Sequence, residues 1–440
     1  MLSDPIVALA TPAGRSALAI VRLSGDDAFA IARRVVSDFQ PDPPRHARLA
    51  SFRAADGTVL DQGLYTAYPG PASYTGEDLV EFSCHGGFVA PAGVLAALQA
   101  AGARLAFPGE FTRRAVLNGK MDLLQAEAVG DLIDASAPAQ ARSALNQLDG
   151  GLSRRLDSLR SSLINLEALL SYSIDFPEED DGPIPLERII GALKLAQEQV
   201  AHLLRTAPAG QKLREGALVV IAGRPNAGKS SLFNALLGTN RVLVSEVPGT
   251  TRDAVEAFTD FNGWPVRLMD TAGLGDFEHA VDRLGVTVSH RYIAAADLVF
   301  LCVDAAREPD AIEREMLDHR TLFLRTRSDL ARPSDGGIPV SSVTGEGLEE
   351  IRRVCVERVF SQGLSGGDLE PVLTRERHRD RLAQALIALN QATEELGGES
   401  DAVLVSHHVR QAIGALDELI GSVDIETVLD QVFSSFCIGK

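Results

Sequence analysis

A glycine-rich turn between an apolar strand and a helix constrains this chain more than any other feature of its sequence. The apolar run Ala217–Ala222 leads directly into Gly223-Arg-Pro-Asn-Ala-Gly228-Lys229-Ser230, and a helical pattern follows at Ser231–Leu237. Turns with this spacing present successive backbone N–H groups to a phosphate chain, and the helix N-terminus behind them adds positive charge. The setting therefore predicts an α/β domain that binds a nucleoside triphosphate.

Two side chains of this turn have specific expected roles. Lys229 should reach the β- and γ-phosphates, which makes it a predicted catalytic residue, and the hydroxyl of Ser230 should ligate Mg²⁺. The predicted nucleotide contacts in this segment are Asn226, Ala227, Gly228, Lys229, Ser230 and Ser231.

The next two segments fit the loops that respond to a γ-phosphate. Pro248–Asp253 offers a second Mg²⁺-ligating hydroxyl, and Thr251 is the candidate for this role and a predicted catalytic residue. The strand Val266–Met269 runs into Asp270, which can hold the metal through water, and the N–H of Gly273 can sense the γ-phosphate. The predicted nucleotide contacts here are Thr251, Asp270, Thr271, Ala272 and Gly273.

Base selection depends on a carboxylate further along the chain. After the apolar strand Leu298–Val303, the run Leu322–Leu324 leads into Thr326-Arg-Ser-Asp329. The carboxylate of Asp329 can accept hydrogen bonds from guanine N1–H and from the 2-amino group, and adenine offers neither donor there. Because a site carboxylate without partners is costly, the order of the motifs favours GTP over ATP.

The guanine segment departs from the usual pattern, Asn-Lys-x-Asp, at its first two positions. Arg327 can still cover the base with its stem, whereas Thr326 cannot reproduce an amide side chain, so we expect weaker guanine binding than usual. The strand at Pro339–Val343 precedes a helix at Leu348–Val359. The predicted contacts around the base are Thr326, Asp329, Ser341, Ser342 and Val343.

The 440-residue chain is long enough for several domains, and its first part has an α+β texture. Short β-branched runs alternate with turns through residues 1–118. We expect strands at Ile6–Ala10, Leu18–Leu23 and Leu79–Phe82, and a helix at Ala92–Ala101.

Helical texture dominates on both sides of the nucleotide domain. Before it, leucines at steps of three or four predict one helical face, at Leu145, Leu148, Leu152, Leu156, Leu159, Leu163, Leu166 and Leu170. We predict one helical domain, residues 119–215 and 362–440, into which an α/β P-loop GTPase domain is inserted at 216–361. Two separate bundles are the alternative.

Composition narrows the partners and the compartment. The formal net charge of −18 counts against a stand-alone RNA-binding protein, because such a protein needs a local basic patch or a second protein to hold RNA. Apolar runs are too short for a membrane span, and the N-terminus lacks the pattern of a signal peptide. The cysteines, at 84, 302, 355 and 437, show neither metal-ligand nor disulfide spacing, so a cytoplasmic location is expected.

Segments along nearly the whole chain resemble the tRNA-modification GTPases of the MnmE, or TrmE, family. The C-terminal Phe436-Cys-Ile-Gly-Lys440 is the most distinctive of them. The others are Ala10–Arg15, Thr75–Asp78, His85–Gly87, Pro108–Phe111, Asn118–Glu127 and Ile174–Pro177.

The resemblance implies that residues 1–118 form a homodimer and bind formyl-tetrahydrofolate as a one-carbon donor. With an FAD-containing MnmG-type partner, in a heterotetramer, members add an aminomethyl- or carboxymethylaminomethyl-type group to C5 of the wobble uridine (U34) of certain tRNAs. The matching folate contacts are Arg22, Glu81 and Lys120, with Lys440 nearby. Cys437 is a possible reactive thiol, although it could also be inert or only redox-sensitive.

The family also uses K⁺ beside the phosphates in place of an arginine finger, and the ion helps two G domains to pair. Asn226 matches its side-chain ligand, and Ser245, Val247 and Thr250 match the loop that completes the shell. Ser245 and Thr250 are also predicted nucleotide contacts. Asp282 stands at the position of a catalytic glutamate and is one methylene shorter, which is compatible with slower hydrolysis or with recruitment of Glu278.

The nucleotide motifs alone leave two other functions open. One is a regulatory GTPase switch that binds the ribosome or another assembly and performs no modification chemistry. The other is a P-loop ATPase, which fails if Asp329 faces the base. The segments of the N-terminal region and the C-terminal pentapeptide argue against a pure switch.

Overall fold

The computed structural model describes residues 4–175, 185–238, 255–270, 291–333, 336–360, 372–396 and 402–421, together with 432, 433, 436 and 439. Contacts divide the chain into two compact units, residues 1–130 with 417–440, and residues 131–416. The predicted domain boundaries at residues 118/119, 215/216 and 361/362 are finer than this division and stay a prediction.

The first unit is built on a six-stranded sheet in the order β3-β4-β5-β2-β1-β6. Its side chains alternate, so that Val21, Phe82 and Cys84 face a buried core under α1 and α2. The elements are β1 (Ile6–Leu9), β2 (Gly14–Ser24), α1 (Ala28–Val35), β3 (Arg48–Arg53), β4 (Val59–Tyr68), β5 (Leu79–Gly87), α2 (Val89–Ala100) and β6 (Arg104–Leu105). The predicted α+β domain is confirmed.

The end of the chain returns to this first unit. Phe433 and Phe436 form an edge-to-face pair, 5.1 Å between ring centroids, against the region of α3 (Glu110–Leu117) and α4 (Leu123–Asp134). Glycines make room for the rings, since a Cβ at Gly130 would lie 3.2 Å from Phe436. The C-terminal segment is thus part of the N-terminal unit in three dimensions.

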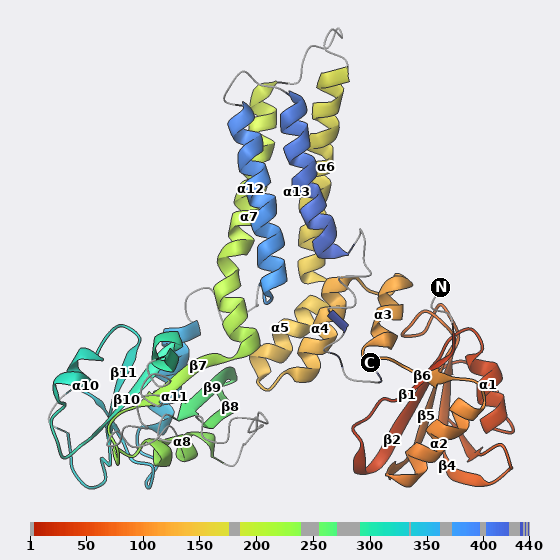
Figure 1. Ribbon diagram of the computed structural model, residues 1–440, viewed down its shortest axis with the longest axis horizontal. Coiled ribbons are helices and arrows are strands. Elements are labelled where there is room, and N and C mark those ends of the chain that lie inside the picture. Colours follow the sequence, from red (N-terminus) through yellow and green to blue (C-terminus); the bar gives the residue numbers. More distant parts are fainter. Residues whose placement is uncertain are drawn as a thin grey trace, which may run out of the picture. The chain divides into compact units, whose positions relative to one another are not determined.

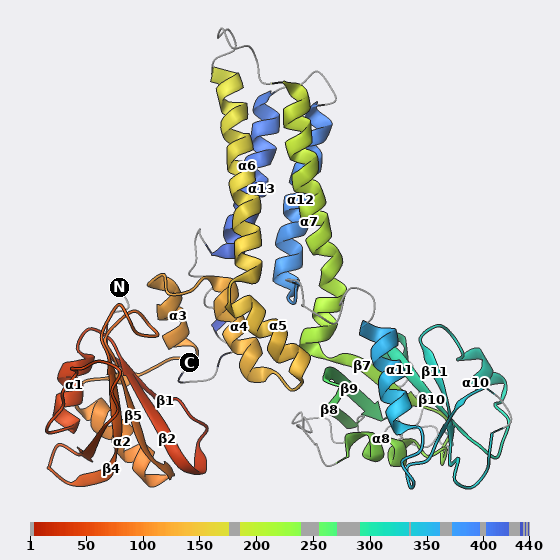
Figure 2. The ribbon, with the colours of Figure 1, turned by 180° about the vertical axis from the view of Figure 1, so that it is seen from behind.

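The helical domain is one bundle assembled from segments on both sides of the nucleotide domain. Four long helices lie side by side in both views (Figures 1 and 2). Gln197 of α7 donates to the side chain of Asn390 of α12 at 2.8 Å, and Arg410 of α13 pairs with Glu167 of α6 at 2.7 Å. The helices of this domain are α5 (Pro138–Leu148), α6 (Gly151–Asp175), α7 (Leu186–Glu215), α12 (Glu376–Leu396) and α13 (Ala402–Ile420).

The leucine stripe expected on a single helix is divided between two. α5 ends at Leu148, and Gly150 has a left-handed φ of +78°, so the chain turns before α6 begins. Leu145 is 46% exposed, whereas the stripe leucines on α6 are buried, namely Leu152, Leu156, Leu159, Leu163, Leu166 and Leu170. The expectation of one continuous face was wrong because an Asp-Gly turn interrupts it without breaking the leucine spacing.

The nucleotide domain is a six-stranded sheet in the order β12-β11-β10-β7-β9-β8, parallel except for the edge strand β8. Strand β7 is apolar throughout, and β10 is apolar up to its last residue, Asp304, because helices cover both sheet faces. The elements are β7 (Ala217–Ala222), α8 (Lys229–Leu237), β8 (Val255–Phe261), β9 (Trp264–Asp270), β10 (Leu298–Asp304), α10 (Ala311–Glu315), β11 (Thr321–Thr326), β12 (Ile338–Val340) and α11 (Leu348–Phe360). The predicted insertion of an α/β domain is confirmed.

Every helix within the described ranges is too short or too polar to span a bilayer.

Candidate functional site

The glycine-rich turn lies where β7 ends and α8 begins. Gly223 has φ +141°, and a Cβ there would lie 2.3 Å from the carbonyl oxygen of Cys302 on β10, so a larger residue does not fit. Gly228, at φ +83°, is the N-cap of α8. Asn226 has φ +64°, a left-handed conformation that asparagine tolerates better than most residues. The strand, turn and helix are therefore arranged as the sequence predicts.

Lys229 begins α8 with its ammonium turned back over this turn. Its side chain is buried, and Nζ donates to the carbonyl of Arg224 at 2.9 Å. Cys302 lies close enough to interact electrostatically with it, but burial raises the pKa of the Cys302 thiol to about 12 against the opposing effect of Lys229. Cys302 is thus a neutral core residue at physiological pH and offers no thiolate to the site.

Asp270 is the last residue of β9, and strand pairing sets it opposite Ile221 of β7. Its carboxylate is 5% exposed, beside the strand that leads into the glycine-rich turn. Ser230, in the first turn of α8, is exposed. Hydroxyl and carboxylate oxygens are the donors that Mg²⁺ prefers, so the residues present fit this ion.

The segment that contains Asp329 is tied to the loop after β12. The backbone N–H of Ser328 donates to the carbonyl of Val340 at 3.1 Å, and its hydroxyl donates to Glu346 at 2.7 Å. Asp329 itself is exposed, so its carboxylate is accessible to a base. The loops after β11 and β12 therefore lie side by side, as base recognition requires.

The loop after β12 folds around the hydroxyl of Ser341. This residue is fully buried, and its Oγ accepts from the N–H groups of Val343 and Thr344, both at 3.2 Å. Ser342 is half-buried, and Val343 is 86% exposed. The buried hydroxyl holds the loop in shape and leaves its tip open to solvent.

Ser231, in the first turn of α8, is exposed, and the other predicted site residues lie outside the described residues. In the nucleotide domain these are Ser245, Val247, Thr250, Thr251, Thr271, Ala272, Gly273 and Asp282, and at the C-terminus they are Cys437 and Lys440.

In the N-terminal domain, Arg22 and Glu81 face each other across β2 and β5. Two guanidinium nitrogens donate to Glu81 Oε1, Nη2 at 2.7 Å and Nε at 3.0 Å. The Arg22 guanidinium carbon lies 5.3 Å from the ring centroid of Tyr74 and 5.7 Å from that of Phe111. Both charged side chains remain partly exposed, 18% and 24%, so the pair is accessible.

Lys120 contacts the loop that leads into β5. Its Nζ donates to the carbonyl of Pro71 at 2.9 Å, in the loop that also contains Tyr74. Gly439 lies against β1, where a Cβ would come within 2.4 Å of the Leu9 carbonyl oxygen. Arg22, Glu81 and Lys120 therefore all belong to the N-terminal unit, whereas Lys440 lies outside the described residues.

Sequence reasoning missed the aromatic neighbours of Arg22 and the contact between Thr326 and the glycine-rich turn. Phe111 ends one of the segments that resemble the family, and Tyr74 directly precedes another. Their positions in the sequence could therefore have indicated that they belong to the site. The hydroxyl of Thr326 donates to the carbonyl of Ala227 at 2.7 Å, which no motif spacing reveals.

The fold and the glycine-rich turn define a P-loop GTP hydrolase with an added helical domain and an N-terminal α+β domain. The chain matches the family model for the MnmE helical domain over residues 123–437 and that for the GTP-binding protein TrmE N-terminus over residues 5–120. It belongs to the MnmE family of tRNA modification GTPases.

Individual relatives agree over their full length. The chain is 39% identical over 452 residues to the tRNA modification GTPase MnmE of Akkermansia muciniphila, and 41% identical over 452 residues to that of Paramagnetospirillum magneticum, with 100% of both chains covered in each case. Among solved structures, the G domain of the T. maritima FeoB iron transporter is 31% identical over 32% of this chain and 98% of that chain, with a TM-score of 0.27. The chain is therefore a GTPase of tRNA modification, and nucleotide and Mg²⁺ dependence follow from its class.

Proposed function

We propose that this GTPase acts in C5 modification of the wobble uridine (U34) of tRNA in the cytoplasm. Formyl-tetrahydrofolate would supply the one-carbon unit, and an FAD-containing MnmG-type protein would be the partner, in a heterotetramer. The product would carry an aminomethyl- or carboxymethylaminomethyl-type group. A regulatory switch without modification chemistry is the alternative that the experiments below distinguish.

The observation that carries this proposal is the partly exposed Arg22–Glu81 pair, whose guanidinium contacts two aromatic rings. A reduced pterin has an N–H and an amino group side by side, and a carboxylate can accept from both. One oxygen of Glu81 already accepts from Arg22, yet a carboxylate has about four lone-pair sites. Tyr74, which is half-buried, adds flat aromatic surface next to the charges, and the fully buried Phe111 packs against the same guanidinium from the core. These residues suit a flat heteroaromatic ligand with an anionic tail.

The roles in the nucleotide domain follow from the turn and its neighbours. We propose that Lys229 binds the β- and γ-phosphates, that Ser230, Thr251 and Asp270 serve Mg²⁺, and that Asp329 selects guanine. The metal would offset the charge that develops on the phosphoryl oxygens. Asp282 would orient the attacking water in place of a longer glutamate.

The N-terminal domain is also the proposed homodimer contact. The sheet face opposite α1 and α2 leaves Leu18, Leu49 and Leu64 exposed by 61%, 69% and 43%. Leu49 and Leu64 are directly paired across β3 and β4. Apolar residues gathered on a sheet face favour burial against a second protein surface.

Replacing Arg22 by alanine should weaken binding of formyl-tetrahydrofolate by about 10- to 100-fold, because a charge-assisted contact is lost and Glu81 loses its partner. Titration calorimetry of the purified chain measures this directly. In a host that lacks the endogenous protein, tRNA nucleosides analysed by mass spectrometry should lose the modified wobble uridine with R22A and regain it with the wild type.

The matched control is Arg33→Ala, an exposed arginine on α1, which should retain both folate binding and modification. GTP hydrolysis should stay unchanged in both variants. Two results together would favour the regulatory switch instead. The wild-type protein would bind no formyl-tetrahydrofolate, and the wobble uridines of the host would stay modified without the protein.

K⁺ should stimulate GTP hydrolysis about tenfold or more over Na⁺, since a cation between the phosphates offsets developing charge. Asn226→Gly removes the amide ligand yet accommodates the left-handed φ of +64°, so it should abolish the preference without straining the turn. The measurement is the steady-state rate in each salt, with Mg²⁺-GDP affinity in Na⁺ as the control for an intact turn. Equal rates in the two salts for the wild type would refute the K⁺ site.

A further inference from the structure

The last residue of β11 is joined directly to the glycine-rich turn. Thr326 is 3% exposed, and its hydroxyl donates to the carbonyl oxygen of Ala227 at 2.7 Å. Its Cβ lies 3.6 Å from the position that a Cβ on Gly228 would take, so the Thr326 side chain also packs against the turn at Gly228. The strand that leads to the guanine segment therefore holds the phosphate-binding turn at a buried point.

The single proton of the Thr326 hydroxyl limits the hydrogen bonds that this side chain can donate. A threonine hydroxyl has one proton, and here it is donated to Ala227. Away from the Watson–Crick edge that Asp329 would read, guanine has the acceptor N7, which needs a donor. An asparagine amide has two N–H groups and an oxygen, so it can hold the turn and still donate to N7. Thr326 can perform only the first of these tasks.

The neighbouring contacts keep the guanine segment in shape without an amide. The N–H of Ala305 donates to the Thr326 carbonyl at 2.8 Å. Arg327, at φ +59°, forms an ion pair with Asp304 at 3.0 Å. The Thr326 carbonyl and the Arg327 side chain are thereby both held at the end of β10, while the Thr326 hydroxyl is directed at the glycine-rich turn.

We propose that Thr326 is a positioning residue for the phosphate-binding turn, and that the guanine segment leaves N7 without a side-chain donor. Selectivity for guanine then depends on the Watson–Crick edge that Asp329 reads. The protein should therefore be indifferent to the atom at position 7 of the purine, in contrast to a GTPase with asparagine at this position.

The first test compares GDP with 7-deaza-GDP, in which C–H replaces N7, on the full-length wild-type chain with Mg²⁺ by titration calorimetry. The two affinities should agree within about twofold, because no hydrogen bond to N7 is lost. A loss of about fivefold or more with 7-deaza-GDP would show that a donor reaches N7 and would overturn the proposal.

The second test changes the side chain. Thr326→Val keeps the shape without the hydroxyl and should weaken GDP and 7-deaza-GDP equally, by about five- to tenfold. Thr326→Ser keeps the hydroxyl and should stay within about threefold of the wild type. Thr326→Asn should create a preference of about fivefold or more for GDP over 7-deaza-GDP.

Each variant result separates a positioning role from a base contact. A Thr326→Val protein that binds both nucleotides like the wild type would show that the bond to Ala227 does not support the turn. If that variant fails to fold, the Ser and Asn variants and the wild-type comparison still decide the question.

Discussion

Replacing Lys229 by alanine is expected to reduce GTP hydrolysis on the order of 10²–10³-fold, the usual effect of removing one donor aimed at developing charge. The ammonium is already turned over the glycine-rich turn, where it donates to the Arg224 carbonyl. When the Lys229 ammonium moves from that carbonyl to a phosphate, it exchanges one oxygen acceptor for a more negative one. Retention of Mg²⁺-GTP should fall as well, because the other cation of the turn, Arg224, is paired with Asp310.

The matched control is Lys194→Ala, an exposed lysine on α7 in the helical bundle, which should hydrolyse GTP like the wild type. Phosphate release under excess GTP and nucleotide retention after gel filtration are the two measurements. A K229A protein that keeps hydrolysis within about fivefold of the wild type would contradict the proposed role.

The parts of the fold that follow one regular pattern could be predicted from the sequence. Strands β7 and β10 are buried on both faces, so they appear in the chain as unbroken apolar runs, and the turn between β7 and α8 requires glycine at fixed positions. In contrast, β3 and β4 have apolar residues on both faces, such as Leu64 outward and Tyr65 inward. This mixture removes the alternation that identifies a strand.

The residues of the candidate site also fall into those that the sequence predicts and those that only the fold reveals. A phosphate-binding turn is a local structure, so its residues are adjacent in the chain and can be recognised together. The surroundings of Arg22 come from β5, from the loop with Tyr74 and from α3 with Phe111, which only the folded sheet brings together. The role of Thr326 depends on a partner 99 positions away, Ala227, and on the direction of one hydroxyl.

The second large effect is expected on the stability of the N-terminal unit, which contains a buried cluster of charged side chains. Arg114 is 1% exposed and pairs with Asp4 at 3.0 Å, Glu77 at 3.1 Å and Glu110 at 2.9 Å. Arg104 also pairs with Glu110, at 2.5 Å. These carboxylates are held together by a guanidinium that has almost no contact with water.

The pKa values of the carboxyls reflect this arrangement. Burial alone would raise the pKa of Glu110, but hydrogen bonds from Arg104, from the Phe107 N–H and from Arg114 outweigh it and lower the pKa. The pKa of Asp4 is also lowered, chiefly by the hydrogen bond from Arg104. A carboxyl whose pKa falls on folding stabilises the fold above its unfolded value, about 4, and that contribution is lost as the pH decreases through the lower, folded value. The N-terminal unit should therefore lose stability in acid.

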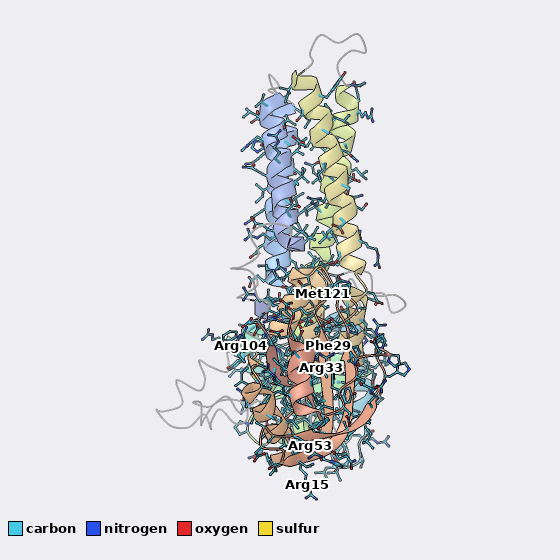
Figure 3. The ribbon with its side chains drawn as sticks, turned by 90° about the vertical axis from the view of Figure 1, so that its right-hand side faces the viewer. Arg15, Phe29, Arg33, Arg53, Arg104 and Met121 are labelled. Carbon is cyan, nitrogen blue, oxygen red and sulfur yellow. The ribbon has the colours of Figure 1, made fainter. Side chains whose placement is uncertain are left out.

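Arg114→Met should destabilise the N-terminal unit by about 3–5 kcal/mol, because it removes the buried cation that Glu77 pairs with and leaves Glu110 with Arg104 alone. The matched control is Arg15→Met, the same change at an exposed arginine of the same unit (Figure 3), which should alter the free energy of unfolding by less than about 0.5 kcal/mol. Hydrogen exchange of peptides from β2, β5 and α3 in increasing urea measures the unit directly. The fluorescence of Trp264, the one tryptophan, reports on the nucleotide domain and should be unaffected. Unchanged exchange in R114M would mean that the ion pairs contribute no net stability, and the acid sensitivity would then need another cause.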